Sequence, residues 1–372
     1  MKLEEHVKEL EKRVKKLEEL LDSMVHEKEA SDIFIVAGLP LSYKVSGQQK
    51  RTDGKQLMPP DTRELIETIY TMAGRDFGAF LDNGNHDEDF SFSIDELSRF
   101  RVNAFRQRNS LGAVIRVIPF GLPDPVAMHI PENVLDQVRY QRGMVLVTGA
   151  AGSGKSTTLA CMVDRLNHER TGHIVTMEDP IEYVHHHGTC IVTQREVPTD
   201  VATYAEALRS SLREAPDVLL LGEMRDQETM STAVTAAEMS QLILSTMHTN
   251  SASSTVDRII DTFPPTQQRQ LRLQLSLVLR AIISQQLVPT KDGGVVPVFE
   301  IMVANTAIRN LIREEKSYQI DSVIAASGKE GMRTMDQSLF QLVKDGTVDK
   351  EIALQHAIHA NALSNRLQAA GL

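Results

Sequence analysis

The sequence predicts an α/β protein, in which a smaller α+β domain precedes a parallel-sheet domain that has a helical C-terminal region. Three observations lead to this class. After residue 126, short and solidly apolar runs alternate with runs of helical periodicity, which is typical of a parallel sheet covered on both faces. Before residue 125, short alternating runs surround one amphipathic helix. The chain has 372 residues, 41% of them hydrophobic and 24% charged, which is enough for two globular cores.

Composition also limits the compartment and the partners. The longest apolar stretches are about as long as a strand, far short of the roughly 20 residues of a membrane helix, and no apolar signal segment opens the chain. We therefore expect a cytoplasmic protein with no direct membrane insertion. Cys161 and Cys190 are the only cysteines, which fits a reducing compartment and excludes a four-cysteine zinc site. The net charge of −10 argues against nucleic acid as a partner, because phosphate binding draws on lysine and arginine.

Residues 1–25 are predicted to form a separate helix with a heptad seam. Nearly every position between the seam residues is charged, and the seam comprises Leu3, Val7, Leu10, Val14, Leu17, Leu21 and Met24. Three interpretations remain open: a coiled coil that promotes self-association, an amphipathic helix packed on its own domain, or an appended segment.

Residues 26–125 are predicted to form the small α+β domain together with its linker. Runs 31–38 and 40–51 alternate like a pair of strands, and the proline-led run 59–74 has helical spacing. Run 89–119 is typical of an antiparallel meander. The following proline-rich run, 120–134, predicts an irregular linker with the domain boundary near residue 125.

Residues 126–372 are predicted to form the parallel-sheet domain. The expected strands are 143–149, 173–179, 217–223 and 242–248. Helices are expected from Lys155 and near 202–214 and 226–238. We expect the last hundred residues to be helical, since runs 331–346 and 350–363 both have helical spacing.

The strongest motif is GAAGSGKST at Gly149–Thr157, which follows an apolar strand and opens a helix. It matches the pattern of a phosphate-binding loop, and we call it the phosphate loop. In such a loop the backbone N–H groups and the helix N-terminus bind phosphate, Lys155 reaches the β and γ phosphates, and Ser156 can bind Mg²⁺. The candidate nucleotide-binding residues are Gly149, Ala150, Ala151, Gly152, Ser153, Gly154, Lys155, Ser156 and Thr157.

Carboxylates follow two of the expected strands. Glu223 ends the strand DVLLLGE, and Glu178, Asp179 and Glu182 follow the preceding one. Parallel strands deliver their C-terminal residues to one edge of the sheet, so these groups should lie beside the phosphate loop. There they would position Mg²⁺ and the attacking water. We expect Asp179 and Glu182 to take part, and leave open whether Glu178 is structural.

Two histidine-containing runs need separate interpretations. His248 ends an apolar strand among hydroxyl residues, and could be a metal ligand, a proton-transfer group, a phosphate sensor or a structural residue. No partner with ligand spacing supports a metal. The run HHHGTC at 185–190 fits no tetrahedral site and is interpreted as an exposed loop.

With these motifs the chain resembles the retraction ATPases of type IV pili, the PilT family of secretion ATPases. The likeness covers essentially everything after about residue 20. The family's boxes occur in order: Walker A at Gly149–Thr157, the Asp box at 177–185, an atypical Walker B box at 219–226 and the His box at 245–261. The chain also carries AIRNLIRE at 307–314, which the family associates with pilus retraction.

The resemblance implies a homohexameric ring that binds ATP and Mg²⁺. Each subunit would join a PAS-like N-terminal domain to a RecA-like ATPase domain, with nucleotide between them. It assigns Lys155 and Ser156 to phosphate and magnesium, Asp179 to the magnesium site, Glu182 to the Asp box, Glu223 to the catalytic water and His248 to the His box. Arg101 and Arg116 resemble the arginines that the family directs toward the triphosphate, where phosphoryl transfer needs positive charge. For His248 this chemistry favours a sensor of the γ-phosphate over a general base.

One departure from the family pattern concerns the His box. Relatives commonly have T-G-H-L where this chain has MSQL, so Gln241 stands in place of a histidine. Glutamine forms hydrogen bonds but cannot become charged, which puts in doubt any role that needs a cationic imidazole there.

The resemblance implies a motor for pilus retraction and twitching motility, working at the inner face of the cytoplasmic membrane on an inner-membrane platform protein and beside other pilus ATPases. Extension and secretion ATPases usually carry a larger N-terminal region and a tetracysteine zinc element, which this sequence lacks. An accessory retraction ATPase, a nucleotide-gated scaffold and a nucleic-acid translocase are the remaining alternatives.

Overall fold

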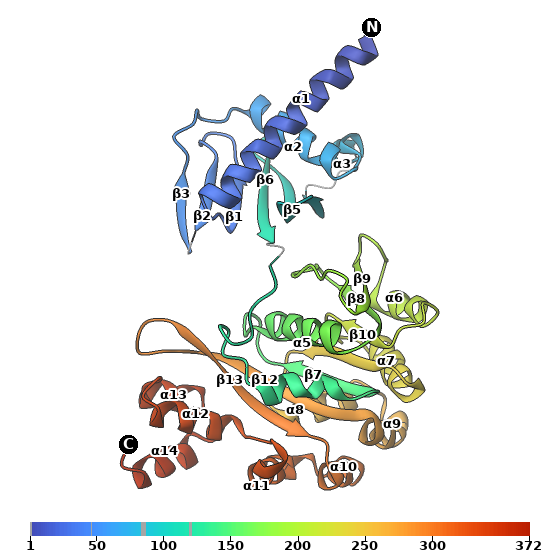
Figure 1. Cartoon of the computed structure of the whole chain (residues 1–372), viewed down its shortest axis with the longest axis vertical. Helices are drawn as coiled ribbons and strands as arrows, with labels where there is room; N and C mark the ends of the chain where they lie inside the picture. Colours follow the sequence, from blue (N-terminus) through green and yellow to red (C-terminus); the bar gives the residue numbers. More distant parts are fainter. Residues whose placement is uncertain (1, 46, 83–86, 119–120) are drawn as a thin grey trace. The chain divides into compact units, whose positions relative to one another are not determined.

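The computed structural model describes residues 2–45, 47–82, 87–118 and 121–372, with side chains from residue 8 onward. The chain divides into two compact units, Met1–Gly121 and Leu122–Leu372 (Figure 1). Each unit has its own hydrophobic core. None of the helices in the described ranges has the length and apolar character of a membrane span.

The first unit contains a six-stranded sheet in the order β3-β2-β1-β6-β5-β4. All neighbouring strands in it are antiparallel. The strands are β1 (Asp32–Ile35), β2 (Ser42–Val45), β3 (Gln48–Arg51), β4 (Asp87–Ile94), β5 (Ser98–Gln107) and β6 (Ser110–Ile118). In β5 buried and half-buried residues alternate, because one face of the sheet packs on the core and the other does not.

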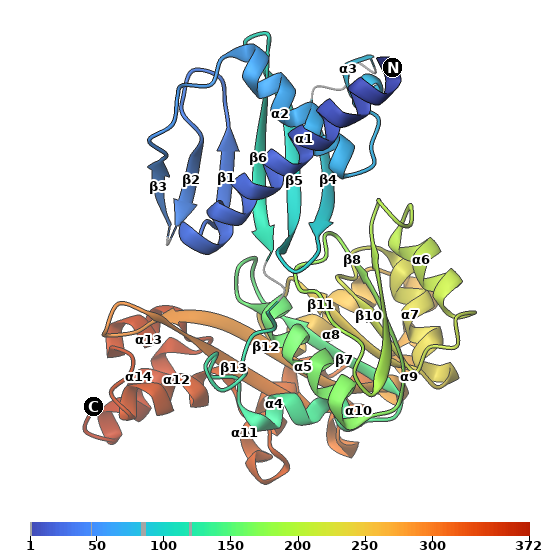
Figure 2. The ribbon, with the colours of Figure 1, turned by 45° about the horizontal axis from the view of Figure 1, so that its top comes forward.

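Helices α1 and α2 cover the packed face of this sheet (Figure 2). The helical elements are α1 (Lys2–Asp22), the π-helical turn η1 (Ser23–Glu27), α2 (Pro59–Met72) and α3 (Phe77–Asp82). Leu17, Leu21 and Met24 of the heptad seam are buried in the unit's core. The C-terminal half of the seam therefore packs on its own domain; the side chains of Leu3 and Val7 lie outside the described residues.

The second unit contains a seven-stranded sheet in the order β13-β12-β7-β11-β10-β8-β9. Six of these strands run parallel to one another: β12, β7, β11, β10, β8 and β9. The edge strand β13 runs antiparallel to β12. The strands are β7 (Gly143–Thr148), β8 (Gly172–Glu178), β9 (Cys190–Glu196), β10 (Val218–Leu221), β11 (Leu242–Met247), β12 (Leu279–Pro289) and β13 (Val295–Val303). Strands β7, β10 and β11 are buried at every position, which is why they appear in the sequence as solid apolar runs.

Helices cover both faces of this sheet. One face packs on α4, η2 and α5, the other on α6 to α11, and the ends of β12 and β13 pack on α12 to α14. The helical elements are α4 (Glu132–Leu135), η2 (Asp136–Arg139), α5 (Lys155–Glu169), α6 (Tyr204–Ser211), α7 (Gln227–Met239), α8 (Ala252–Asp261), α9 (Pro265–Val278), α10 (Thr306–Arg313), η3 (Ser317–Gln319), α11 (Ile320–Ala326), η4 (Gly328–Glu330), α12 (Met335–Lys344), α13 (Lys350–His356) and α14 (Ala360–Ala369).

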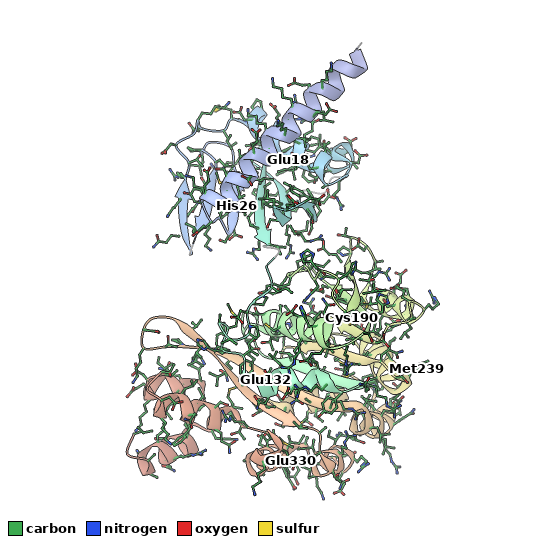
Figure 3. The ribbon with its side chains drawn as sticks, viewed as in Figure 1. Glu18, His26, Glu132, Cys190, Met239 and Glu330 are labelled. Atoms are coloured by element: carbon green, nitrogen blue, oxygen red, sulfur yellow. The ribbon has the colours of Figure 1, made fainter. Side chains whose placement is uncertain are left out.

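The predicted fold class is confirmed, but the prediction of a helical last hundred residues is wrong over 279–303. That segment forms β12 and β13, because β12 pairs with the exposed edge of β7 and β13 completes the sheet beyond it. The predicted helix at 350–363 is divided into α13 and α14. The strand β9 was not predicted at all; it begins at Cys190 (Figure 3), a buried free cysteine.

Candidate nucleotide-binding and catalytic site

The phosphate loop connects β7 to α5 at the C-terminal edge of the sheet. Two of its glycines, Gly149 and Gly154, pack closely against Gln285 of β12. Gly149 has a φ of +148°, and a Cβ there would lie 2.2 Å from the carbonyl oxygen of Gln285. Gly154 has a φ of +88° and caps α5 in the left-handed conformation, which other residues rarely adopt. The helix N-terminus behind the loop favours an anion.

Lys155 folds back over the phosphate loop. Its Nζ donates to the carbonyl oxygens of Gly149 at 2.9 Å and Ala150 at 2.8 Å. Burial lowers the pKa of Lys155, while the charges of Glu223 and Glu182 oppose that shift. The ammonium is therefore held inside the curve of the loop and faces two carboxylates, where a phosphate group would be attracted to it.

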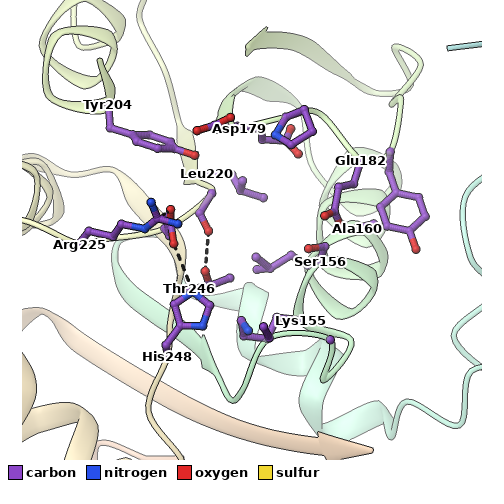
Figure 4. Close-up of a pocket in the computed structure, with 18 of the residues that line it drawn as sticks. Lys155, Ser156, Ala160, Asp179, Glu182, Tyr204, Leu220, Arg225, Thr246 and His248 are labelled. Carbon is purple, nitrogen blue, oxygen red and sulfur yellow. Dashed lines mark hydrogen bonds and ion pairs between the residues drawn. The ribbon is translucent and has the colours of Figure 1, made fainter. Parts of the chain in front are cut away.

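A cavity of about 270 Å³ lies beside the phosphate loop, and we call it the loop cavity. It brings together eight of the candidate site residues predicted from the sequence: Ala151, Gly152, Lys155, Ser156, Asp179, Glu182, Glu223 and His248. Figure 4 shows Lys155 and Ser156 on one side of it and Arg225 and His248 on another. The carboxyl ends of β7, β8, β10 and β11 supply these residues, as expected for a ligand site in a parallel sheet.

Glu223 follows β10, and its two carboxylate oxygens contact Arg225 and His248. Its Oε1 pairs with Nε of Arg225, and its Oε2 lies 3.3 Å from Nε2 of His248. The Glu223 side chain is only 13% exposed. Glu223 is thus a nearly buried carboxylate that faces the loop cavity.

Thr246 on β11 fixes the position of this carboxylate. Its Oγ1 donates to the carbonyl oxygen of Gly222 at 2.6 Å, and its own carbonyl oxygen accepts from the N–H of Met224 at 3.2 Å. Two hydrogen bonds therefore clamp the residues on either side of Glu223 to the strand that carries His248. The separation of Glu223 and His248 is set by the backbone of two neighbouring strands.

The oxygen donors around Ser156 fit Mg²⁺. The Ser156 hydroxyl and the carboxylates of Asp179 and Glu182 line the loop cavity, and Mg²⁺ prefers such oxygen ligands. Within the described ranges, no group of three or more His, Cys, Asp or Glu is arranged to hold a metal by itself. This is the usual situation for Mg²⁺, which proteins bind through one or two side chains together with substrate phosphates.

Glu178 is tied to neighbouring side chains more than to the loop cavity. It accepts from Thr176 Oγ1 at 2.6 Å and from Gln194 Nε2 at 3.2 Å. Burial raises the pKa of Glu178 to about 7, and those hydrogen bonds oppose the shift. These contacts support a structural role, although Glu178 also lines the cavity.

Arg101 and Arg116 belong to the first unit. They lie directly opposite each other on β5 and β6, and Arg116 Nε pairs with Asp32 Oδ1 at 3.0 Å. Like charges placed opposite each other in a sheet are destabilising, and Asp32 is the carboxylate that pairs with Arg116. The arrangement suits the binding of an anion.

Gln241 lies far from the loop cavity. It directly precedes β11, whereas His248 follows the other end of that strand, about 20 Å away for six extended residues. The replacement of a histidine by the uncharged Gln241 therefore does not change the charge at the phosphate site. Its neighbour Ser240 has a φ of +125°, at the position where the T-G-H-L pattern has glycine.

The histidine run 185–187 is built into the structure before β9 and is not an exposed loop throughout. His185 is 9% exposed and lines the loop cavity, and burial lowers its pKa to about 4. The Nδ1 of His187 accepts from the N–H of Val192 at 3.1 Å, so the run supports the start of the strand.

Sequence reasoning missed Arg225, Tyr204 and Thr246. All three line the loop cavity. Arg225 could have been found from its place two residues after Glu223 at the same strand end. Tyr204 opens α6 and Thr246 lies inside a strand, so only the tertiary fold brings them to the cavity.

The chain matches known proteins over most of its length. The family model described as Type II/IV secretion system protein matches residues 8–294. The type IV pilus retraction ATPase PilT of Pseudomonas aeruginosa is 44% identical over 332 residues, which cover 88% of this chain and 94% of that protein. The type IV pilus ATPase PilU of the same organism is 43% identical over 348 residues, covering 93% and 90%.

Solved structures give the same result. The crystal structure of the pilus retraction motor PilT with bound ADP superposes with a TM-score of 0.84 and 43% identity, covering 91% of this chain and 96% of that one. The ATPase DotB of Legionella pneumophila superposes with a TM-score of 0.77 and 27% identity, covering 90% and 94%.

Proposed function

The chain belongs to the type II/IV secretion system protein family and is an ATPase, and we propose that it is the motor that retracts type IV pili and drives twitching motility. One observation carries the proposal beyond the identity to PilT. The loop cavity places the phosphate-loop lysine, a nearly buried glutamate and a histidine at one sheet edge. These are the groups that a phosphoryl-transfer site needs for positioning and charge stabilisation.

In the proposed reaction, the phosphate loop and Lys155 bind the β and γ phosphates of ATP. Glu223 orients a water molecule whose oxygen bonds to the γ-phosphorus, while the bond from that phosphorus to the β,γ-bridging oxygen breaks. ADP and inorganic phosphate leave, and the proton of the water passes to Glu223 or to the phosphate. Ser156 and Asp179 would hold Mg²⁺, which neutralises phosphate charge when bound. Glu182 would hold water in the metal's surroundings.

Arg101 and Arg116 would add positive charge to the triphosphate. The pairing of two arginines across β5 and β6 supports this role, because their mutual repulsion is relieved by an anion. Positive charge at the γ-phosphate would stabilise the charge that develops during phosphoryl transfer.

We further propose that the chain works as a homohexamer at the cytoplasmic face of the inner membrane, where it acts on a pilus platform protein. The coverage of about nine tenths of PilT and PilU supports these partners. Movement of the units during ATP turnover would then be transmitted to the platform.

A second candidate function is that of an accessory retraction ATPase. It is favoured by the identity to PilU, which nearly equals the identity to PilT. Two strains separate the roles: one lacking the main retraction ATPase and one lacking the accessory ATPase. We expect the chain to restore retraction in the first strain. Restoration only in the second would assign the accessory role.

Phosphate release in solution tests the partner class. We expect the cytoplasmic part of the platform protein to stimulate release and double-stranded DNA to have no effect. Stimulation by DNA alone would identify a translocase. Release that stays at background with either partner would identify a nucleotide-gated scaffold.

A further inference from the structure

The proposed catalytic carboxylate is held from both sides. Arg225 Nε pairs with Glu223 Oε1, and His248 Nε2 lies 3.3 Å from Glu223 Oε2. A water molecule that is to be oriented by Glu223 must share one of these oxygens with a group already there. The first oxygen is the more firmly held, since its partner is a guanidinium, which always carries a positive charge.

The two side chains of this ion pair, Arg225 and Glu223, differ in their exposure to solvent. The backbone of Arg225 is fixed on both sides: Met224 donates its N–H to Thr246, and the side chain of Asp226 caps α7 by accepting from Thr229 at 2.8 Å. The Arg225 side chain, however, is 73% exposed, whereas that of Glu223 is 13% exposed. The Arg225 guanidinium is therefore open to a new partner from solvent, whereas the Glu223 carboxylate lies among packed neighbours.

Arg225 lines the loop cavity together with Lys155 and Ser156. Guanidinium binds phosphate in the same forked geometry as carboxylate, and the terminal phosphate of ATP carries more negative charge than one carboxylate. The Arg225 side chain of this pair is exposed, and His248 remains beside Glu223 as a hydrogen-bond partner when the guanidinium changes its acceptor. ADP lacks the terminal phosphate and offers no such exchange.

We propose that Arg225 is a positioning residue that distinguishes ATP from ADP. In the nucleotide-free and ADP-bound protein it holds Glu223. When ATP binds, Arg225 transfers to the γ-phosphate and leaves Glu223 Oε1 free to orient water. The inference rests on the proposed ATPase site and not on the pilus role, so nucleotide binding and steady-state kinetics test it without pili.

A double-mutant cycle in nucleotide affinity tests this coupling. The variants are Glu223→Gln, Arg225→Gln and their combination, each titrated with Mg²⁺ and either ADP or the non-hydrolysable analogue AMPPNP. Glu223→Gln removes the charged partner of Arg225 and leaves its guanidinium available to the γ-phosphate. We therefore expect this substitution to tighten AMPPNP binding about fivefold to tenfold. In the Arg225→Gln background the same change should alter AMPPNP affinity by less than about twofold. ADP affinity should stay within about twofold throughout.

The outcome that overturns the proposal is equally defined. If Glu223→Gln tightens AMPPNP binding equally with and without Arg225, the gain comes from lost negative charge alone and Arg225 does not couple to it. Equal effects on ADP and AMPPNP would also contradict it. Arg209→Gln is the matched control, because Arg209 forms a similar pair with Glu228 outside the cavity.

Kinetics give a second readout that a merely structural arginine would not change. Arg225→Gln should raise KM for ATP and lower kcat without changing ADP inhibition, and Arg225→Lys should restore part of kcat because its ammonium keeps the charge. A loss of ADP binding together with ATP binding would assign Arg225 to the shape of the site. Melting temperatures of all variants show whether each is folded.

Discussion

His248 lines the loop cavity and contacts Glu223. Lys155, by contrast, belongs to the phosphate loop and contacts the backbone of that loop. The two hydrogen bonds of Thr246 hold the backbone of Gly222 and Met224, the residues on either side of Glu223. His248 is half exposed, and its Nε2 faces a carboxylate that has another partner. This geometry agrees with a group that senses the state of Glu223 and the γ-phosphate.

The first prediction concerns His248→Ala. It should keep nucleotide affinity but lower the steady-state rate of phosphate release on the order of 10- to 100-fold, because Glu223 loses one of its two positioning contacts. Enzyme assays with His168→Ala provide the control, since His168 pairs with Asp164 on α5 outside the cavity. Unchanged turnover in His248→Ala would make the residue structural.

The second prediction concerns Ser240, whose φ of +125° is strained for any residue with a side chain. Ser240→Gly should stabilise the second unit by about 1 kcal/mol and raise Tm by about 2–4 °C. Ser231→Gly, at an exposed site inside α7, should instead destabilise it by about 0.5 kcal/mol. Thermal unfolding that shifts in the same direction for both would exclude backbone strain as the cause.

At the scale of elements, Glu300 on β13 links two helices. Its Oε1 accepts from the N–H of Ala252 at 2.8 Å at the start of α8, and its Oε2 accepts from the N–H of Met335 at 3.4 Å at the start of α12. Helix N-termini favour negative charge, yet Glu300 is 1% exposed. Burial dominates and raises the pKa of Glu300 to about 7.

A third prediction follows for the pH dependence of stability. A glutamate titrates near 4.5 without burial, so between pH 4.5 and 7 the folded state holds a proton that the unfolded state releases. The contribution is full below pH 4.5 and is lost as pH rises through 7. Glu300→Gln should therefore weaken the fall in unfolding free energy between pH 5 and 8, on the order of 2–3 kcal/mol. Urea midpoints at both pH values measure it.

The exposed Glu351→Gln is the control for this measurement. If Glu300→Gln and Glu351→Gln show the same pH dependence as the unmodified chain, Glu300 does not hold a proton in the folded protein. Glu178 shifts in the same direction, so part of the pH dependence should persist in Glu300→Gln.

The sequence predicted those elements whose pattern is local. Strands β7, β10 and β11 are buried on both faces, and the phosphate-loop pattern is continuous in the sequence, so the position of Lys155, Ser156 and Glu223 at one edge of the sheet could be predicted. Strand β9 has an exposed Ile191 and mixed polar residues, and β12 contains a Ser-Gln-Gln run, so neither has a clear period. Arg225, Tyr204 and Thr246 act through tertiary contacts, which no spacing in the sequence contains.

At the scale of the whole molecule, α1 does not behave as a detachable segment. Leu17, Leu21 and Met24 are buried in the core of the first unit. Removal of residues 2–25 would therefore create a cavity, and losing each leucine side chain costs about 2–5 kcal/mol. A shorter truncation is needed to ask whether the helix promotes assembly.

The fourth prediction is that a chain lacking residues 2–9 still assembles. In Mg²⁺ and AMPPNP, light scattering should give six times the mass of a single chain, both for the full chain of 41.4 kDa and for the shortened one. A monomer on truncation, with unchanged melting temperature, would instead make the N-terminal half of the seam the device that assembles the ring.

The most direct test of the account is pilus retraction in living cells. Cells that lack their own copy of the chain are supplied with the unmodified chain or Glu223→Gln at equal levels, and labelled pili are followed by fluorescence microscopy. We predict that the unmodified chain restores retraction and that Glu223→Gln leaves pili extended, because turnover falls on the order of a hundredfold or more. Retraction by Glu223→Gln at the unmodified rate, or none with the unmodified chain, would contradict the account.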